Sequence, residues 1–278
     1  MLVFKTIAAL QTFLNTRRGS IGFVPTMGAL HAGHISLIEQ CKSENELTVC
    51  SIFVNPLQFN NTTDLEKYPR TLPDDMLMLQ QAGCDVLFAP DAQEMYASEA
   101  DASLDFSPGA LDTLFEGRMR PGHFMGVAVV VHKLFRIVQP THAYFGLKDY
   151  QQCMLISKLV RDLKLPVQLH FCPTLREPDG LAMSSRNRRL KAEERSAALR
   201  IYEALQYAKS HYRTIKSSAI EDWCKSYMQQ SPLYRVEYFN IVSAETLLPV
   251  MHEDEPAVAL CAAFVGDVRL IDNMILTA

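Results

Sequence analysis

The stretch Phe23-Val24-Pro25-Thr26-Met27-Gly28-Ala29-Leu30-His31-Ala32-Gly33-His34 is where we expect the chemistry of this chain to lie. It continues an apolar run, Ile21 to Val24, that is typical of a buried strand, and Pro25 is predicted to end that strand. A glycine-containing turn follows, and residues 35–41 show the apolar spacing of a helix. The stretch therefore predicts a strand, a tight turn, and a helix with two histidines at its start.

This turn is predicted to bind an anion. Free main-chain N–H groups and the positive end of the helix dipole favour negative charge there. Gly28 and Gly33 let a ligand approach the main chain closely. The imidazoles of His31 and His34 can donate hydrogen bonds to phosphate oxygens.

Three other interpretations compete with a phosphate site. Gly28 and Gly33 have the spacing of a P-loop, but His34 and Ile35 stand where a P-loop has Lys and Ser or Thr. His31 and His34 could ligate a metal, yet no Cys, Asp or Glu lies near enough in the sequence to complete a ligand set. Two structural histidines at a helix cap stay an alternative, against which only the rest of the chain argues.

Composition excludes several classes of protein. The 278 residues suffice for two domains, and 48% hydrophobic and 21% charged residues are ordinary for a globular protein. A formal net charge of -4 without a basic block argues against nucleic acid as a partner. We find no signal-peptide pattern at the N-terminus and no run suited to span a membrane. The seven cysteines form no C-x-x-C pair, which favours reduced thiols in a cytoplasmic protein.

Short apolar runs alternate with helical patterns up to about Cys172. This alternation is typical of an α/β fold with a Rossmann-like, doubly wound parallel sheet. Ligands of such sheets lie beyond the carboxyl ends of the strands, so the turn at 25–34, Asn55 and Gly146 are expected to meet at one crevice. The predicted strands are 21–24, 47–54, 86–89, 143–145 and 167–172, and the predicted helices are 35–42, 72–82, 127–138 and 150–163.

The pattern changes after Cys172, where a smaller α+β domain is predicted. A charged helix is expected from Lys191 to about Tyr212, and a second helix from Ala219 to Met228. Three strand-like runs close the chain, at 236–242, 258–265 and 268–275. The predicted domains are therefore 1–173 and 174–278.

Several loop segments carry polar groups that suit a phosphorylated ligand. Asn55 and Gln58 directly follow a predicted strand and offer amide groups for a hydroxylated ligand, with a capped turn as the alternative. Segments 68–70 and 118–124 place an arginine beside proline, where it can hold a carboxylate or phosphate or form a surface salt bridge. Segment 184–186 supplies hydroxyls and a cation suited to pyrophosphate, although serine-rich loops are common.

The segment 146–152 is predicted to join a strand end to a helix start. Gly146 permits a ligand to approach closely, and Lys148 supplies a point charge for phosphate. Asp149 could cap the helix or hold a ribose hydroxyl. Gln152, on the first helical turn, could face the same crevice.

Taken in order, these motifs resemble the pantoate–β-alanine ligase family along nearly the whole chain. The histidine pair alone would indicate only the broader nucleotidyltransferase superfamily, which class I aminoacyl-tRNA synthetases share. The motifs that carry the resemblance are Pro25-Thr26-Met27-Gly28 with His31 and His34, Phe53-Val54-Asn55-Pro56 with Gln58, Tyr68-Pro69-Arg70-Thr71, Arg120-Pro121-Gly122-His123-Phe124, Lys148-Asp149 with Gln151-Gln152, residues 179–187, and residues 266–273.

The resemblance implies a function as well as a fold. It implies ATP-dependent condensation of pantoate with β-alanine through a pantoyl-adenylate, with release of AMP and pyrophosphate. It also implies Mg²⁺ used with ATP, and a cytoplasmic homodimer without nucleic-acid or membrane partners. The implied fold is a Rossmann-like nucleotide domain with a smaller C-terminal domain that covers the site.

Site residues follow from the resemblance position by position. His34 would be the proton donor, and His31, Lys148 and Arg186 would be catalytic with it. Leu147 stands where the family often has Glu or Gln, so no side-chain role is expected there. The implied ATP-binding residues are Met27, Gly28, Ala29, Leu30, His31, Ala32, Gly33, His34, Gly146, Leu147, Lys148, Asp149, Leu175, Met183, Ser184, Ser185 and Arg186. The implied pantoate and β-alanine residues are Gln58, Gln152, Asn55, Tyr68 and Arg120.

Two other functions stay open on the residues alone. A nucleotidyltransferase that keeps the nucleotide on its product would share the His31 and His34 turn, but it would not need Gln58 and Gln152 for a small hydroxylated acid. A non-catalytic nucleotide-binding module would not need so many polar groups at one crevice.

Overall fold

The computed structural model describes residues 1–60, 62–252 and 255–276. The chain divides into two compact units. The first unit consists of Met1–Leu147 with Gln151–Pro173, and the second of Lys148–Tyr150 with Thr174–Ala278.

The short segment Lys148–Tyr150 belongs to the second unit although it lies within the predicted first domain. Two hydrogen bonds account for this. The side-chain amide of Asn273 donates to the main-chain oxygen of Lys148 at 2.8 Å, and the Tyr150 hydroxyl donates to the main-chain oxygen of Ala244 at 2.7 Å. Neither bond is visible in the sequence, because each joins residues about a hundred positions apart.

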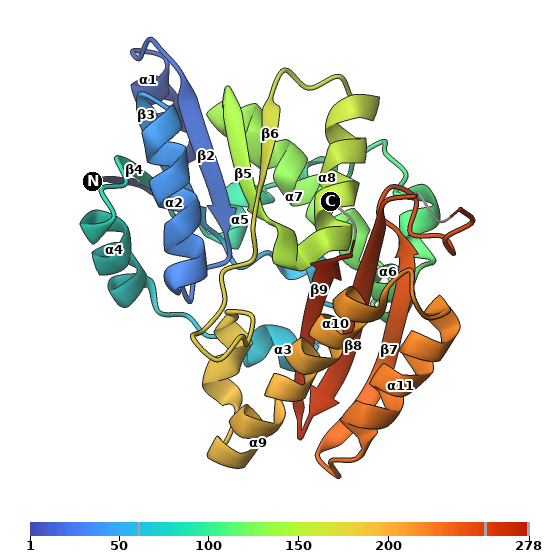
Figure 1. The fold of residues 1–278 in the computed structure, drawn as a ribbon. Coiled ribbons are helices and arrows are strands. Elements are labelled where there is room, and N and C mark those ends of the chain that lie inside the picture. Colours follow the sequence, from blue (N-terminus) through green and yellow to red (C-terminus); the bar gives the residue numbers. More distant parts are fainter. Residues whose placement is uncertain (61, 253–254, 277–278) are drawn as a thin grey trace. The chain divides into compact units, whose positions relative to one another are not determined.

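A six-stranded sheet forms the centre of the first unit, and every strand pair in it is parallel (Figure 1). The spatial order is β1-β4-β3-β2-β5-β6, so the strand order changes direction between β2 and β5. Such a switch point opens a crevice at the carboxyl ends of the two strands. The strands are β1 (Leu2–Phe4), β2 (Ile21–Thr26), β3 (Leu47–Ile52), β4 (Val86–Phe88), β5 (His142–Gly146) and β6 (Gln168–Cys172).

Helices cover both faces of this sheet, which confirms the predicted doubly wound α/β architecture. Helices α2 and α4 contact each other on one face, and α1 contacts α7 on the other. Helix α7 is buried along most of its length because its sequence is almost wholly apolar. The helices of this part are α1 (Ile7–Leu14), α2 (Ala32–Glu44), α3 (Thr62–Glu66), α4 (Leu72–Gln81), α5 (Ala92–Met95), α6 (Phe115–Met119), α7 (His123–Val138) and α8 (Tyr150–Asp162).

The prediction that Pro25 ends the first strand is wrong, since β2 continues through it to Thr26. Proline lacks an N–H donor and is tolerated where a strand has no ladder bond to lose. The ladder between β2 and β5 covers only Gly22 and Phe23, so that flank of the strand is already unpaired at Pro25. The ladder with β3 runs on to Thr26, whose main-chain oxygen accepts from the N–H of Phe53 at 3.0 Å.

Other differences concern short elements that the patterns did not predict and the exact ends of elements that they did. The patterns did not predict β1 or α1, because β1 has only three residues and most of α1 is exposed. Helix α7 begins four residues before its predicted start, in a turn that contains His123 and Gly126. The remaining strands and helices of the sheet are present with ends shifted by a few residues.

The second unit is built on an antiparallel sheet of three strands with helices packed on it, as predicted (Figure 1). Its central strand is almost wholly buried because one neighbour lies on each side and α10 contacts it. The single helix predicted from Lys191 to Tyr212 is divided at Ala198. The elements are α9 (Ala192–Ala197), α10 (Leu199–His211), α11 (Ser217–Gln229), β7 (Tyr234–Ser243), β8 (Ala257–Val265) and β9 (Val268–Ile275).

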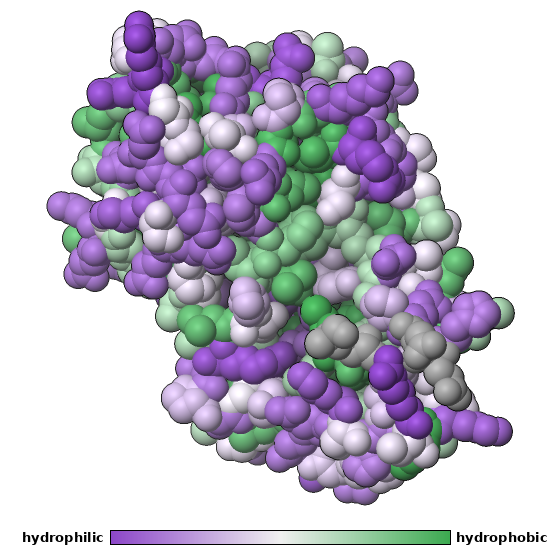
Figure 2. All heavy atoms as spheres, turned by 45° about the horizontal axis from the view of Figure 1, so that its top comes forward, coloured by the Kyte–Doolittle hydropathy of each residue, from purple (hydrophilic) through white to green (hydrophobic). Residues whose placement is uncertain are grey.

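Among the described residues, no helix has both the length and the apolar character needed to cross a membrane. On the face drawn in Figure 2, hydrophilic side chains predominate and hydrophobic ones gather in a few places. Large exposed apolar side chains are scattered over several elements, among them Leu77, Trp223 and Leu248. Single exposed apolar residues of this kind are ordinary for a folded chain.

Candidate active site

The turn between β2 and α2 has an unusual main chain. Gly28 and Ala29 both adopt the left-handed conformation, with φ of 79° and 51°. Glycine takes this conformation readily, whereas alanine does so only where its surroundings hold it.

Asp75, on the first turn of α4, holds this turn in place. Its carboxylate accepts hydrogen bonds from the N–H groups of Ala29 at 2.9 Å and Leu30 at 2.8 Å, and from the hydroxyl of Thr71 at 3.1 Å. Asp75 is 1% exposed, so these hydrogen bonds stabilise the charge of a buried carboxylate. The sequence analysis missed Asp75. The available signal was its place four residues before Leu79, on the buried side of α4.

The prediction that the N–H groups of this turn are free is wrong. Buried N–H groups are satisfied within the protein when no ligand is present, and here the acceptors are neighbouring side chains. Gly28 donates to the Thr26 hydroxyl, Ala29 and Leu30 donate to Asp75, His31 donates to Nδ1 of His34, and Gly33 donates to Nδ1 of His31. The prediction that this turn binds an anion therefore depends mainly on the two imidazoles.

The two imidazoles cap helix α2 reciprocally. Nδ1 of His31 accepts from the N–H of Gly33 at 3.1 Å, and Nδ1 of His34 accepts from the N–H of His31 at 3.4 Å. A neutral imidazole that accepts through Nδ1 carries its proton on Nε2. The ring centroids lie 4.1 Å apart, so the cap orients two Nε2–H donors near the positive end of the helix dipole. A structural role and a ligand-binding role are thus compatible for these histidines. The cap uses Nδ1 of each ring, and binding of a phosphate would use Nε2.

Asn55 follows β3 and is 1% exposed. Its Oδ1 accepts from the N–H of Leu57 at 3.2 Å and from the hydroxyl of Tyr96 at 2.8 Å. Its Nδ2 donates to the main-chain oxygen of Gly126 at 3.0 Å and to Oε1 of Gln58 at 3.1 Å. Both acceptor positions and both donors of the amide are used inside the protein. Asn55 therefore caps the turn, as the structural alternative predicts, and its amide also contacts Gln58, while its expected contact with a ligand stays a prediction.

Gln58 ends the short 3-10 turn Pro56–Gln58 and is also buried. Its Nε2 lies 2.9 Å from Sδ of Met27, so the two predicted ligand segments meet here. Gly126 lets α7 approach this turn, since a Cβ at that position would lie 2.2 Å from the main-chain oxygen of Leu57. Close packing of α7 thus holds the main chain at Leu57 and Gln58.

His123 connects Arg120 to the same turn. Its Nε2 lies 3.1 Å from Nη1 of Arg120, and its Nδ1 lies 2.8 Å from the main-chain oxygen of Gln58. Arginine can only donate, so Nε2 is the acceptor and the proton lies on Nδ1. The sequence analysis named His123 only as part of the motif at residues 120–124 and gave it no role, and it did not single out Tyr96, which no local pattern marks.

The other expected residues of the first unit lie near strand ends or this turn. The ring of Tyr68 contacts the ring of Phe59, the residue after Gln58, with centroids 5.7 Å apart. Gly146 ends β5 and has open space where a Cβ would lie. Gln152, on the first turn of α8, is partly exposed, whereas its neighbour Gln151 is buried and holds main-chain groups of residues 111–116.

The expected phosphate-binding groups of the second unit lie on two segments. Nζ of Lys148 lies 3.9 Å from Oδ2 of Asp149, whose side chain is 47% exposed. Ser184 caps the 3-10 helix 185–189, since its hydroxyl accepts from the N–H of Arg186 at 3.3 Å. The main-chain N–H of Met183 donates to the oxygen of Leu175 at 3.0 Å, which brings those two residues together.

No group of three or more His, Cys, Asp or Glu among the described residues is arranged to hold a metal ion.

Related proteins are similar to this chain in sequence and fold over most of its length. The family model described as pantoate-beta-alanine ligase matches residues 2–275. A pantothenate synthetase of Cytophaga hutchinsonii is 49% identical over 261 residues, which cover 92% of each chain. The crystal structure of pantothenate synthetase from Thermus thermophilus has a TM-score of 0.95 and 43% identity, with 100% of both chains covered. A pantoate-beta-alanine ligase from Francisella tularensis, crystallised with beta-gamma ATP and beta-alanine, has a TM-score of 0.84 and 36% identity, covering 100% of this chain and 99% of that one.

Proposed function

Because the chain belongs to the pantoate–β-alanine ligase family, we propose that it condenses pantoate with β-alanine in a reaction driven by ATP. The family match over residues 2–275 carries this proposal. The Francisella tularensis relative, crystallised with an ATP compound and β-alanine, supports two of the three substrates.

The first step is activation of the pantoate carboxylate. A carboxylate reacts poorly with amines because its leaving group would be oxide. Attack by a carboxylate oxygen on the α-phosphorus of ATP forms an O–P bond and breaks the bond to the bridging oxygen of pyrophosphate, which departs with its electron pair. The product is a pantoyl-adenylate with a good leaving group.

His31 and His34 stabilise this step in our proposal. Their Nε2–H groups suit the oxygens of the α-phosphate, where charge shifts during in-line displacement. Donors that are held in place before the reaction lower the barrier because they need no reorganisation. The mutual capping contacts supply that preorganisation.

Lys148 and Arg186, with the hydroxyls of Ser184 and Ser185, are proposed to bind the pyrophosphate. Gly146, Asp149, Leu175 and Met183 are proposed to contact the nucleotide, and Leu147 only through its main chain. Gln58 and Gln152 are proposed to bind the hydroxyls of pantoate, with Tyr68 and Arg120 beside them. Mg²⁺, when bound with ATP, supplies charge neutralisation of the phosphates.

The second step is attack by the β-alanine amine on the adenylate carbonyl, which forms the amide and releases AMP. No covalent enzyme intermediate is proposed. All seven cysteine thiols are buried, and burial raises the pKa of Cys172 to about 11. No cysteine is therefore proposed to act as a thiolate nucleophile. The activated acid then stays bound noncovalently.

We further propose that the enzyme is a cytoplasmic homodimer, which sedimentation velocity and cell fractionation test.

Isotope exchange tests the proposed reaction. With ATP, Mg²⁺ and pantoate but no β-alanine, labelled pyrophosphate should enter ATP, and omission of pantoate should abolish the exchange. Addition of β-alanine should give free AMP and pantothenate. A product that retains the nucleotide would favour the nucleotidyltransferase alternative. Exchange that requires β-alanine would exclude the stepwise scheme.

A further inference from the structure

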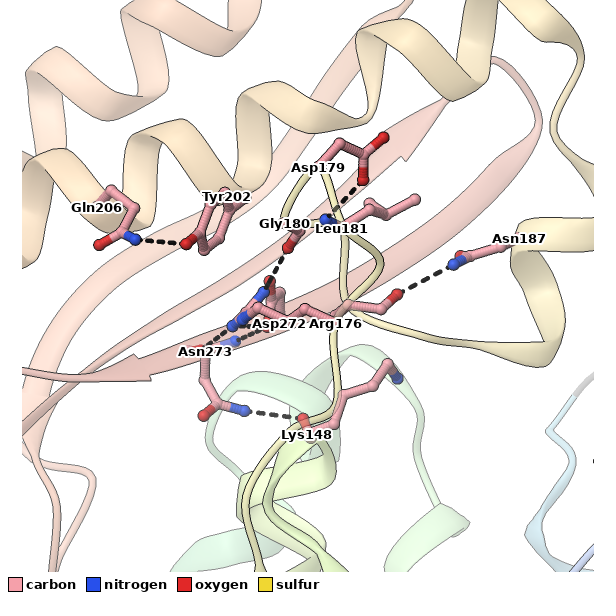
Figure 3. A network of polar contacts seen from close by, with 11 residues as sticks. Lys148, Arg176, Asp179, Gly180, Leu181, Asn187, Tyr202, Gln206, Asp272 and Asn273 are labelled. Atoms are coloured by element: carbon pink, nitrogen blue, oxygen red, sulfur yellow. Dashed lines mark hydrogen bonds and ion pairs between the residues drawn. The ribbon is translucent and has the colours of Figure 1, made fainter. Parts of the chain in front are cut away.

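In the second unit, an ion pair with a buried carboxylate joins the loop that follows β6 to strand β9, an edge strand of the sheet (Figure 3). Nη1 of Arg176 lies 2.6 Å from Oδ2 of Asp272, and Nη2 lies 3.0 Å from Oδ1, so the contact is bidentate. The side chain of Asp272 is 4% exposed and that of Arg176 is 18% exposed. Paired hydrogen bonds of this kind fix the plane of both groups.

The same guanidinium makes three further contacts. Nη1 donates to the main-chain oxygen of Gly180 at 3.0 Å, and Nη2 donates to the main-chain oxygen of Asn273 at 3.2 Å. Its Cζ lies 4.9 Å from the centre of the Tyr202 ring, a favourable cation–π distance. Arg176 therefore ties one loop and one helix to β9.

Asn273, next to the ion pair, extends this network to Lys148 (Figure 3). Its Nδ2 donates to the main-chain oxygen of Lys148 at 2.8 Å, and its own N–H donates to Oδ1 of Asp272 at 2.8 Å. Asn273 is 6% exposed, so the bond to Lys148 is protected from competition by water.

We propose that Asn273 is a positioning residue that acts through Lys148, and that the Arg176–Asp272 pair fastens both phosphate-binding segments of this unit to β9. This rests on the proposed function, in which Lys148 and Arg186 bind the pyrophosphate of ATP. One segment is held at Lys148 through Asn273. The other, residues 174–187, is held through Arg176 at its base and Gly180 at its tip.

The physical reason for such an anchor is the length of the lysine side chain. Four methylene groups separate the ammonium from the main chain, so an unanchored Lys148 would spread its charge over a wide volume. A displacement of about 1 Å at a reacting group can cost on the order of 10²-fold in rate. Fixing the main-chain oxygen of Lys148 removes part of this freedom without touching the ammonium.

Removal of the Asn273 amide tests the proposal. We expect Asn273→Ala to lower the turnover number of pantoate-dependent pyrophosphate exchange roughly 10-fold or more, since the ammonium is then less well placed. Asn240→Ala, which removes an amide that donates to Glu221 in the same unit, is the matched control and should leave exchange unchanged. Arg176→Lys, which keeps the charge but loses the planar fork, should reduce exchange in the same direction.

A double-mutant cycle separates positioning from general destabilisation. If Asn273 acts through Lys148, then Asn273→Ala should have little further effect in a Lys148→Ala background, on both the exchange rate and the ATP dissociation constant. Equal effects in both backgrounds would overturn the proposal, as would an unchanged exchange rate in the single variant. Absence of pantoate-dependent exchange in the wild-type enzyme would instead contradict the proposed function. Far-UV circular dichroism identifies any variant that does not fold. If Asn273→Ala does not fold, the cycle is measured with Arg176→Lys in its place.

Discussion

The histidines of the β2–α2 turn show how one side chain can serve structure and chemistry together. Nδ1 of each ring accepts from the main chain at the start of α2, which leaves the proton on Nε2. The cap thus selects the tautomer that a phosphate-binding role requires. This pairing could be predicted from the sequence, because all its groups lie within four consecutive residues, His31 to His34.

Loss of the His34 imidazole should therefore impair chemistry more than folding. We expect His34→Ala to slow adenylate formation by roughly 10²-fold, the effect of losing one preorganised donor. Stability should fall only by about 1 kcal/mol, the usual cost of a lost helix cap. Single-turnover formation of the adenylate and urea unfolding measure the two effects, and near-normal turnover would contradict the role proposed for His34.

Asp75 offers a second prediction about a single residue. Asp75→Asn replaces one carboxylate oxygen by an amide that cannot accept, so one of the N–H groups of Ala29 and Leu30 loses its partner. An unsatisfied buried donor costs about 1–3 kcal/mol, and the free energy of unfolding should fall by that amount.

Asp74→Asn is the matched control, because Asp74 is exposed on the same first turn of α4. Its effect on unfolding in urea should stay within about 0.5 kcal/mol. Similar losses in both variants would mean that the charge at the helix start, rather than the anchor to the turn, determines the stability.

Among the elements, the end of α2 is joined to β5 and β6 by a polar cluster. The hydroxyl of Tyr144 donates to Oε2 of Glu44 at 2.7 Å, and Nδ1 of His170 lies 3.3 Å from the same oxygen. Nε2 of His170 lies 2.8 Å from Nδ1 of His142. The cluster thus connects one helix to two neighbouring strands, away from the predicted ligand residues.

This cluster predicts a pH dependence of stability. The hydrogen bond from Tyr144 is the main cause that lowers the pKa of Glu44 below its ordinary value of 4.5. A lowered pKa in the folded state stabilises the fold above the unfolded pKa, and this stabilisation is lost as the pH falls through the folded pKa. The difference in unfolding free energy between the wild type and Glu44→Gln should therefore be present at pH 7 and shrink below about pH 4.5.

Urea unfolding between pH 3 and pH 7 measures this difference. Glu39→Gln serves as the control because Glu39 is exposed on the same helix. A difference for Glu44→Gln that persists unchanged at the lowest pH would exclude the ionised carboxylate as its source.

At the scale of the whole molecule, every cysteine is a buried thiol. Burial raises the pKa of Cys84 to about 11 and of Cys41 and Cys224 to about 12. Only the thiolate reacts readily, and reaction further needs access to the sulfur. The thiols therefore report on unfolding. Cys41, Cys50, Cys84, Cys153 and Cys172 lie in the first unit, and Cys224 and Cys261 lie in the second.

We expect the native protein to release no chromophore from a disulfide reagent over several minutes at pH 8, and seven equivalents in denaturant. Independent unfolding of the units should release the thiols in steps of five and two. A thiol that reacts at once in the native state would contradict the burial of that residue.

Local sequence patterns were enough to predict the fold class of both parts and most of the longer helices and strands. Apolar periodicity indicated the α/β first part and the α+β second part, since a helix or strand shows its buried face over a few residues. The motif order indicated the family. Which buried polar groups contact one another becomes visible only in the folded chain. Asp75 reaches Leu30 across 45 residues, His123 reaches Gln58 across 65, and Asn273 reaches Lys148 across 125. Such pairs form because a buried donor must find an acceptor wherever the chain brings one, and no local pattern records that partner.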